Sequence, residues 1–115
     1  PAYADAPASA DAPAYPDATF ILGHSGGSNH ASAIKLALEN PNVYLEWCGS
    51  FCSTQRWEEV IAKVGEGRVL YGTDAMAHSM DWELGRLLSL DLPDEKLVPI
   101  LGANMRAILA RRISA

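Results

Sequence analysis

The sequence predicts an α/β fold in which parallel strands alternate with helices. Three short apolar runs, each ending in glycine or a small polar loop, have the length and composition of strands. Segments with apolar residues at helical spacing separate these runs and follow the last one. Strands joined by helices need crossover connections, which build parallel sheets from right-handed βαβ units. The carboxyl ends of all three strands are therefore expected at one edge of the sheet.

Residues 1–16 are predicted to form an irregular tail, and residues 17–115 the folded βα part of the chain. The tail consists mainly of alanine, proline and aspartate and has almost no aliphatic bulk. Its prolines Pro7, Pro13 and Pro16 interrupt any helix longer than about two turns. A chain of 115 residues is expected to hold one domain at most.

The first predicted strand and helix flank a glycine-rich turn. The strand covers 19–23, where apolar and β-branched residues end at a glycine. The helix covers 29–40, with a possible cap at Ser28 or Asn29 and a stop at Pro41. A strand, a tight turn and a helix are therefore expected in this order.

The later elements continue the alternation. They are a strand over 43–47, a helix capped by Ser53 or Thr54 and ended by Gly65, a strand over 68–71, and helices started by Asp81, Pro93 and Asn104. The helix after the second strand has the clearest amphipathic pattern, because its apolar residues recur at i, i+3, i+4 and i+7. The predicted order is strand and helix twice, then a strand and three helices.

Charge and composition exclude several classes of protein. Nine basic and fourteen acidic side chains give a net charge of -5, and a nucleic-acid partner is therefore not expected. No apolar run is long enough for a membrane span, and we expect a soluble, cytoplasmic protein without a membrane partner. Cys48 and Cys52 are too few for a disulfide scaffold and lack a second ligand pair at zinc-like spacing. Both are expected to be free thiols.

Polar side chains follow each predicted strand and identify a candidate site. His24 ends the first strand, Glu46 and Cys48 end the second, and Asp74 ends the third. An imidazole there can bind a metal or move protons near neutral pH, and a carboxylate can do either. We therefore predict His24 and Asp74 as catalytic and metal-binding residues. His78, four residues after Asp74, is predicted to contact substrate.

The glycine-rich turn also allows a different kind of enzyme. Residues 23–27 fit G-x-S-x-G, the nucleophile elbow of α/β-hydrolases, with Ser25 as the nucleophile. That fold needs a histidine after the acid, and only His78 follows Asp74, on the same loop. A serine esterase with Ser25 as the nucleophile is thus an alternative, but His78 is poorly placed to act as its base. The turn can also bind a phosphate or carboxylate group of a ligand, and Ser25 is therefore a predicted substrate-binding residue.

Four segments carry a resemblance to a known family. PDATFILGHSGG, ENPNVYLEWCGS, RVLYGTDAM and ILGANMRAIL resemble, in order and spacing, the last three βα units of amidohydrolase-related, metal-dependent TIM-barrel hydrolases and decarboxylases. The resemblance covers roughly residues 16–112 and implies the sixth to eighth strands of a barrel that is incomplete in this chain. It implies that His24 contacts a metal or positions its water, and that Asp74 is a metal ligand or proton carrier. Asn104 would lie in the family's closing helix.

The resemblance implies a divalent metal cofactor, most often zinc, that activates water and polarises a substrate carbonyl or carboxylate. The expected function is that of a metal-dependent hydrolase or decarboxylase acting on a small carboxylate, lactone, ester or amide. Two ligands do not complete a zinc site, which takes at least three protein ligands. The chain is therefore expected to be a homo-oligomer or to be completed by further barrel strands. The alternative is a non-enzymatic, truncated module that binds or assembles.

Overall fold

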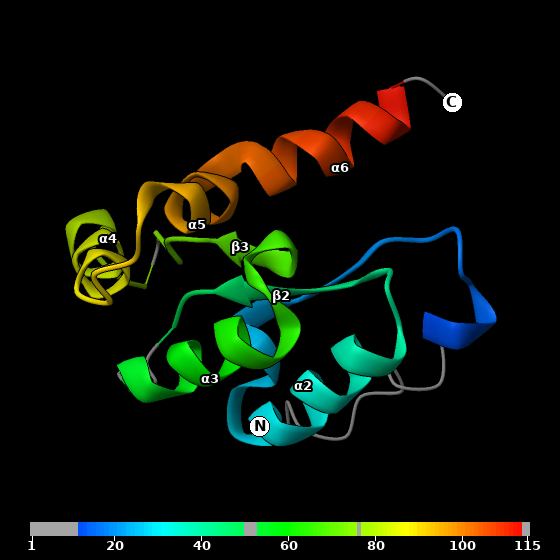
Figure 1. Ribbon diagram of the computed structural model, residues 1–115, viewed down its shortest axis with the longest axis horizontal. Helices are drawn as coiled ribbons and strands as arrows, with labels where there is room; N and C mark the ends of the chain where they lie inside the picture. The colour runs from blue at the N-terminus through cyan, green and yellow to red at the C-terminus, as the bar shows by residue number, and fades with distance from the viewer. Residues whose placement is uncertain (1–11, 50–52, 76, 114–115) are drawn as a thin grey trace.

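The computed structural model describes residues 12–49, 53–75 and 77–113 of the 115-residue chain. Strands and helices follow one another in the predicted order (Figure 1). The strands are β1 (Phe20–Leu22), β2 (Val43–Trp47) and β3 (Val69–Tyr71). The α-helices are α2 (His30–Glu39), α3 (Thr54–Val64), α4 (Met80–Leu88), α5 (Asp94–Val98) and α6 (Asn104–Ile113). The remaining helical turns are η1 (Gly23–Asn29), η2 (Glu66–Arg68) and η3 (Pro99–Ala103).

The three strands form one parallel sheet in the order β1-β2-β3, as predicted. Ile21 pairs with Tyr44 across the first two strands, and Glu46 pairs with Leu70 across the last two. The helices α2 and α3 form the crossovers between successive strands. All three strands therefore end at the same edge of the sheet.

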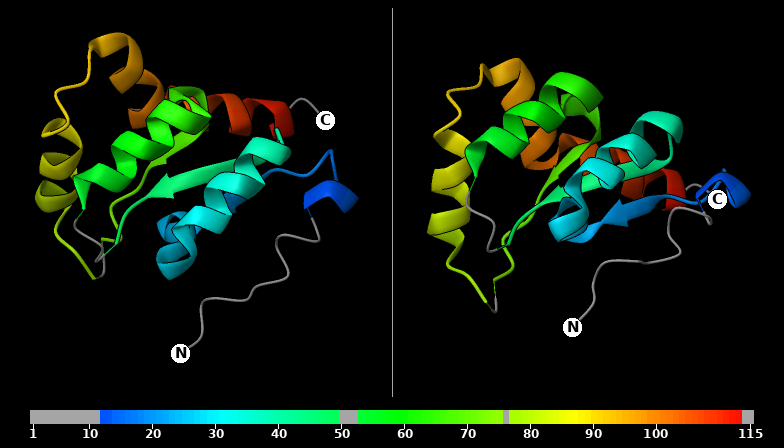
Figure 2. Two further views of the ribbon diagram at one scale, coloured as in Figure 1. Left: turned by 60° about the horizontal axis from the view of Figure 1, so that its bottom comes forward. Right: turned by 90° about the horizontal axis from the view of Figure 1, so that it is seen from below.

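Helices cover the sheet unequally on its two faces. The views in Figures 1 and 2 place α2 and α3 on one face and α6 on the other. The larger apolar core lies under α2 and α3, where Val43, Leu45 and Trp47 alternate along β2 and are fully buried. Tyr44 and Leu70 point to the opposite face and pack with residues of α6 in a smaller cluster. This division follows from the alternation of side chains along a strand.

Several helix caps differ from the predicted ones. The cap of α4 is Ser79, whose Oγ accepts a hydrogen bond from the backbone N–H of Trp82 at 3.4 Å. The prediction of Asp81 as the cap is wrong, because the helix begins before it and Asp81 lies in the first turn. Asn29 and Ser53 occupy the predicted cap positions of α2 and α3, but their side chains make no capping hydrogen bond there. Packing of the apolar faces therefore defines these starts more than capping does.

Part of the predicted tail is attached to the sheet. The side-chain amide of Asn42 donates to the carbonyl oxygens of Ala12, Tyr15 and Ala18 at 3.2, 3.1 and 2.9 Å. Residues 12–14 are helical, so the prediction of an irregular tail is wrong there, and Ala12 is fully buried in the larger core. The other residues of that predicted tail, 1–11, lie outside the described residues. Within the described chain, no helix has the length and apolar character needed to cross a membrane.

Candidate metal centre

Three potential metal ligands meet at the carboxyl edge of the sheet. His24 lies in η1, two residues beyond the end of β1; Cys48 follows β2 directly, and Asp74 lies in the loop after β3. One donor atom from each residue lies within 4.8 Å of the donor atoms of the other two. His24 is exposed, and the other two are half-buried. The structure therefore brings together the two predicted metal-binding residues and adds a thiol to them.

The backbone at this edge is held in a conformation that residues with side chains rarely adopt. His24, Ser25 and Asp74 have positive φ values of 54°, 48° and 48°. Such left-handed residues cost free energy unless the surroundings hold them, and they are concentrated at active sites and ligand clamps. The strained positions coincide with three of the residues predicted from the sequence.

Glu46 holds the turn after β1 in place. Its Oε2 accepts a hydrogen bond from the backbone N–H of His24 at 3.1 Å, and its backbone carbonyl accepts one from Ser25 Oγ at 2.9 Å. The same Oε2 accepts a hydrogen bond from Cys48 Sγ at 2.9 Å. One carboxylate thus links the ends of β1 and β2.

The thiol of Cys48 lies between Glu46 and His24. Its Sγ is 3.7 Å from His24 Nδ1. Burial, and then the hydrogen bond and negative charge of Glu46, raise the pKa of the Cys48 thiol to about 12. The cysteine is therefore a protonated thiol near neutral pH unless a cation is bound to it.

Gly49 allows the loop after β2 to approach His24. Its φ is +105°, and a methyl group at this position would overlap Nδ1 of His24 and lie 2.9 Å from its Cε1. Only glycine fits there without displacing the imidazole.

A buried ion pair from α4 holds Gly49 from the other side. Glu83 is fully buried, and its Oε1 accepts a hydrogen bond from the backbone N–H of Gly49 at 3.2 Å. Arg86 Nη1 donates to the carbonyl of Gly49 at 2.8 Å and lies 2.9 Å from Glu83 Oε2. We call Glu83 and Arg86 the α4 clamp, because together they bind both backbone groups of Gly49.

The predicted substrate-binding residue His78 lies beside Asp74. Its Nε2 is 3.8 Å from Asp74 Oδ2, and both side chains are partly exposed. The backbone N–H groups of Ala77 and His78 donate to the carbonyl of Asp74 at 2.7 and 2.9 Å, which closes the loop into a tight turn. His78 therefore lies next to the carboxylate, at a distance longer than a direct hydrogen bond.

Ser25, the other predicted substrate-binding residue, is buried, with only 1% of its surface exposed. Its hydroxyl donates to the Glu46 carbonyl, so Oγ is bound to backbone in this structure. A small cavity between η1 and α3 is lined by Ser25 with His24, His30, Cys48 and Arg56. The structure thus gives Ser25 a role in holding the turn and gives the serine-esterase alternative no support.

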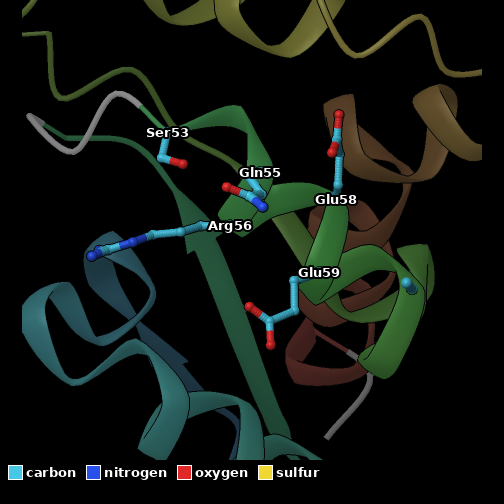
Figure 3. A pocket seen from close by; sticks show the side chains of 6 residues that line it. Ser53, Gln55, Arg56, Glu58 and Glu59 are labelled. Atoms are coloured by element: carbon cyan, nitrogen blue, oxygen red, sulfur yellow. The ribbon is translucent and has the colours of Figure 1, made fainter.

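A second hollow lies along α3 and shares Arg56 with the small cavity beside Ser25 (Figure 3). Arg56 reaches from its rim to the carbonyl oxygen of Gly27 at 3.4 Å. Glu59 in this hollow forms an exposed ion pair with Lys63 on the next turn. The acidic side chains of this hollow are exposed and do not point toward one another as a set of ligands. The hollow is therefore a weaker candidate for the functional site than the strand ends.

Three contributors to the site were not predicted from the sequence. Cys48 was placed at the end of the second strand but was not predicted as a ligand, because it was judged as a zinc motif with Cys52, which lies outside the described residues. The α4 clamp has the i, i+3 spacing of an ordinary surface ion pair. Position directly after a strand is the signal that identifies Cys48.

The described residues form a parallel α/β unit with a cluster of potential metal ligands at the carboxyl ends of its strands. The chain belongs to the amidohydrolase family, because the family model described as Amidohydrolase matches residues 5–111. This confirms the resemblance seen in the sequence. No curated protein matches the chain significantly.

Two solved structures share the fold. The crystal structure of 2,6-dihydroxybenzoate decarboxylase from Rhizobium matches with a TM-score of 0.68 and 20% identity, over 87% of this chain and 37% of the decarboxylase. A dihydroxybenzoic acid decarboxylase from a Polaromonas species, with bound manganese and the inhibitor 2-nitroresorcinol, matches with a TM-score of 0.65 and 20% identity, over 83% of this chain and 34% of that enzyme. The chain therefore spans about a third of these proteins, and its fold is a partial barrel.

The donor atoms at the strand ends fit a divalent metal ion. A nitrogen, a sulfur and a carboxylate oxygen are all ligands of zinc in proteins, and catalytic zinc sites use three protein ligands. The three side chains come from three different strand ends, which is how barrel folds assemble their sites.

Proposed function

We propose that this chain supplies part of the metal centre of an amidohydrolase-type enzyme that decarboxylates or hydrolyses a small carboxylate, lactone, ester or amide. The observation that carries the proposal is the convergence of His24 and Asp74 donor atoms at the carboxyl edge of the sheet. Family membership and the likeness to decarboxylases support it. Because the chain spans about a third of those decarboxylases, the activity proposed is that of the complete protein.

His24 and Asp74 would hold the ion. A divalent ion bound there polarises a substrate carbonyl or carboxylate and acidifies bound water. The Glu46 hydrogen bond to the backbone N–H of His24 helps to hold the turn from which the imidazole projects before any ligand arrives. This preorganisation lowers the cost of binding and of reaching the reactive geometry.

Asp74 and His78 would move protons. Asp74 has two carboxylate oxygens, so one can bind the ion while Oδ2 remains 3.8 Å from His78 Nε2. An imidazole at this position would act as a general acid or base toward this oxygen through one bridging water. His78 is partly exposed at the same edge, where a substrate would arrive. Ser25 would support the turn that presents His24.

Decarboxylation of dihydroxybenzoic acids is the first reaction to test, because both structural neighbours carry out that chemistry according to their names. We expect the complete protein to release carbon dioxide from such an acid, to lose activity with a chelator, and to recover it with zinc or manganese. Asp74→Asn and His24→Gln should each lower kcat at least about 100-fold, whereas Lys35→Gln on the exposed side of α2 should not. Activity that is unchanged by chelation and by both substitutions would contradict the proposal.

A further inference from the structure

We propose that the α4 clamp positions the imidazole of His24 for catalysis, by holding the peptide of Gly49 beside which the ring lies. The proposal rests on the proposed function, since it takes His24 as a catalytic residue. It goes beyond that function by assigning two positioning residues, Glu83 and Arg86, on a helix outside the strand-end cluster.

The imidazole of His24 occupies the place where a side chain of Gly49 would be. A methyl group on Gly49 would overlap the ring nitrogen Nδ1 and would lie 2.9 Å from Cε1 and 3.1 Å from Cγ. The backbone N–H of His24 is held separately, because it donates to Glu46 Oε2 at 3.1 Å. Glu46 therefore fixes the backbone of the turn, whereas Gly49 limits where the ring can lie.

The clamp holds Gly49 at both of its backbone polar groups. Glu83 Oε1 accepts a hydrogen bond from the Gly49 N–H at 3.2 Å, and Arg86 Nη1 donates to the Gly49 carbonyl at 2.8 Å. The two side chains also bind each other, with 2.9 Å between Nη1 and Oε2. Glycine has the widest choice of backbone conformations, and Gly49 is held at φ +105°. Two charge-assisted hydrogen bonds therefore select one conformation of this loop.

Stability alone does not account for an ion pair at this place. Glu83 and Arg86 are 0% and 7% exposed. Removing two charges from water costs free energy, and apolar residues of similar volume often stabilise a fold equally well or better. The next residue of the helix, Leu87, is itself fully buried in the apolar core. The two hydrogen bonds to Gly49 are what an apolar pair could not provide.

The expected consequence is a loss of rate rather than of substrate binding. Misplacing a catalytic group by about 1 Å can lower a rate about 100-fold. Without the clamp, Gly49 is free to rotate and the ring of His24 loses its fixed neighbour. The other groups at the strand ends keep their places, so kcat should fall while KM changes little.

The first test separates stability from activity in the complete protein. Glu83→Leu with Arg86→Met should be more stable to urea than Arg86→Met alone, because no unpaired charge is left buried. Its kcat for decarboxylation of a dihydroxybenzoic acid should still be at least about tenfold below the wild-type value, with KM within about threefold. Glu59→Leu with Lys63→Met, the same kind of change in an exposed pair on α3, should leave kcat unchanged.

Two single variants test the hydrogen bond itself. Glu83→Gln and Glu83→Leu both remove the charge that faces Arg86, but only glutamine keeps an oxygen that can accept the N–H of Gly49. At a temperature at which both variants are folded, kcat should be about fivefold higher in Glu83→Gln than in Glu83→Leu. Equal kcat values in the two variants overturn the positioning role.

A histidine label gives a readout that does not depend on activity. With carbon-13 in the histidine rings, the nuclear magnetic resonance signal of His24 is identified by its loss in His24→Gln. The signal should shift in the double clamp variant and stay in place in the α3 control. An unshifted signal, or a double clamp variant with the wild-type kcat, overturns the positioning role and leaves the proposed function standing. A His24→Gln protein as active as the wild type overturns the proposed function, whereas a shifted signal still supports the positioning of the ring.

Discussion

Single residues decide how closely the strand ends can approach one another. Gly49 has φ +105° and lies against the imidazole of His24, while His24 and Asp74 themselves have positive φ. Residues with side chains at such angles cost about 1 to 3 kcal/mol each, which the surrounding hydrogen bonds must offset. The site is thus built at the expense of local backbone stability.

Gly49→Ala should damage the metal centre more than the fold. The added methyl group overlaps His24 Nδ1, so the imidazole must turn away from Cys48 and Asp74. We expect zinc affinity, measured by titration calorimetry, to fall at least about tenfold. Gly65→Ala is the matched control, because Gly65 also has a positive φ, +88°, and a methyl group there meets nothing within 4 Å. Equal zinc affinity in Gly49→Ala and wild type would show that the loop does not position His24.

Among single residues, the sequence predicted His24 and Asp74 because each lies within a few residues of the end of an apolar run. It did not predict the partnership of Cys48 with them, since spacing within the chain does not show which side chains meet across a sheet. The buried state of Ser25 was also out of reach, because its partner is a backbone carbonyl on another strand.

Among the elements, α4 has the clearest link to the site. It follows β3 in sequence, yet its buried Glu83 and Arg86 bind the loop after β2. The guanidinium group also lies 5.6 Å from the centre of the Trp47 ring. The helix therefore fixes the end of the central strand from outside the sheet.

Arg86→Met should destabilise the protein strongly, because it leaves the charge of Glu83 buried without its cation. A loss of about 3 to 5 kcal/mol in the free energy of unfolding is expected, measured by urea denaturation of the complete protein. The double variant Glu83→Leu with Arg86→Met should recover much of this loss. Lys63→Met, which removes the cation of an exposed pair on α3, should have little effect. If Arg86→Met is as stable as Lys63→Met, the result contradicts the stabilising role of the α4 clamp.

The elements themselves were largely predictable from the sequence. Apolar periodicity placed the three strands and the helices α2 and α3 within a few residues of their observed bounds. Capping was less predictable: several polar residues near a helix start can cap it, and tertiary packing decided that Ser79 does so for α4.

On the scale of the whole molecule, the described sheet has two outer strands, β1 and β3, each paired on one side only within the described residues. Large apolar side chains are also exposed on the outer helices, among them Met80, Trp82, Leu88, Val98 and Leu109. Open strand edges and apolar patches favour association. Both features agree with a partial barrel that packs against further strands or other copies.

A polypeptide limited to residues 1–115 should therefore self-associate. We expect light scattering to give a mass well above 12.4 kDa. Ile21→Lys, on the outer strand β1, should reduce the association, because a charge on an edge strand opposes pairing. Leu38→Lys, an equally apolar and exposed position on α2, should have less effect. A monodisperse wild-type monomer with a cooperative thermal transition would contradict this prediction.

The measurement that tests the central claim most directly is the metal content of the complete protein, purified without added metal, by elemental analysis. We predict about one divalent ion per chain in the wild type, and a loss of most of it in Asp74→Asn, which keeps the size of the side chain but removes its charge. Glu66→Gln, away from the strand ends in η2, should retain the ion. A wild-type protein without a divalent ion, or an Asp74→Asn variant with undiminished metal, would show that the carboxyl edge of this sheet is not a metal centre.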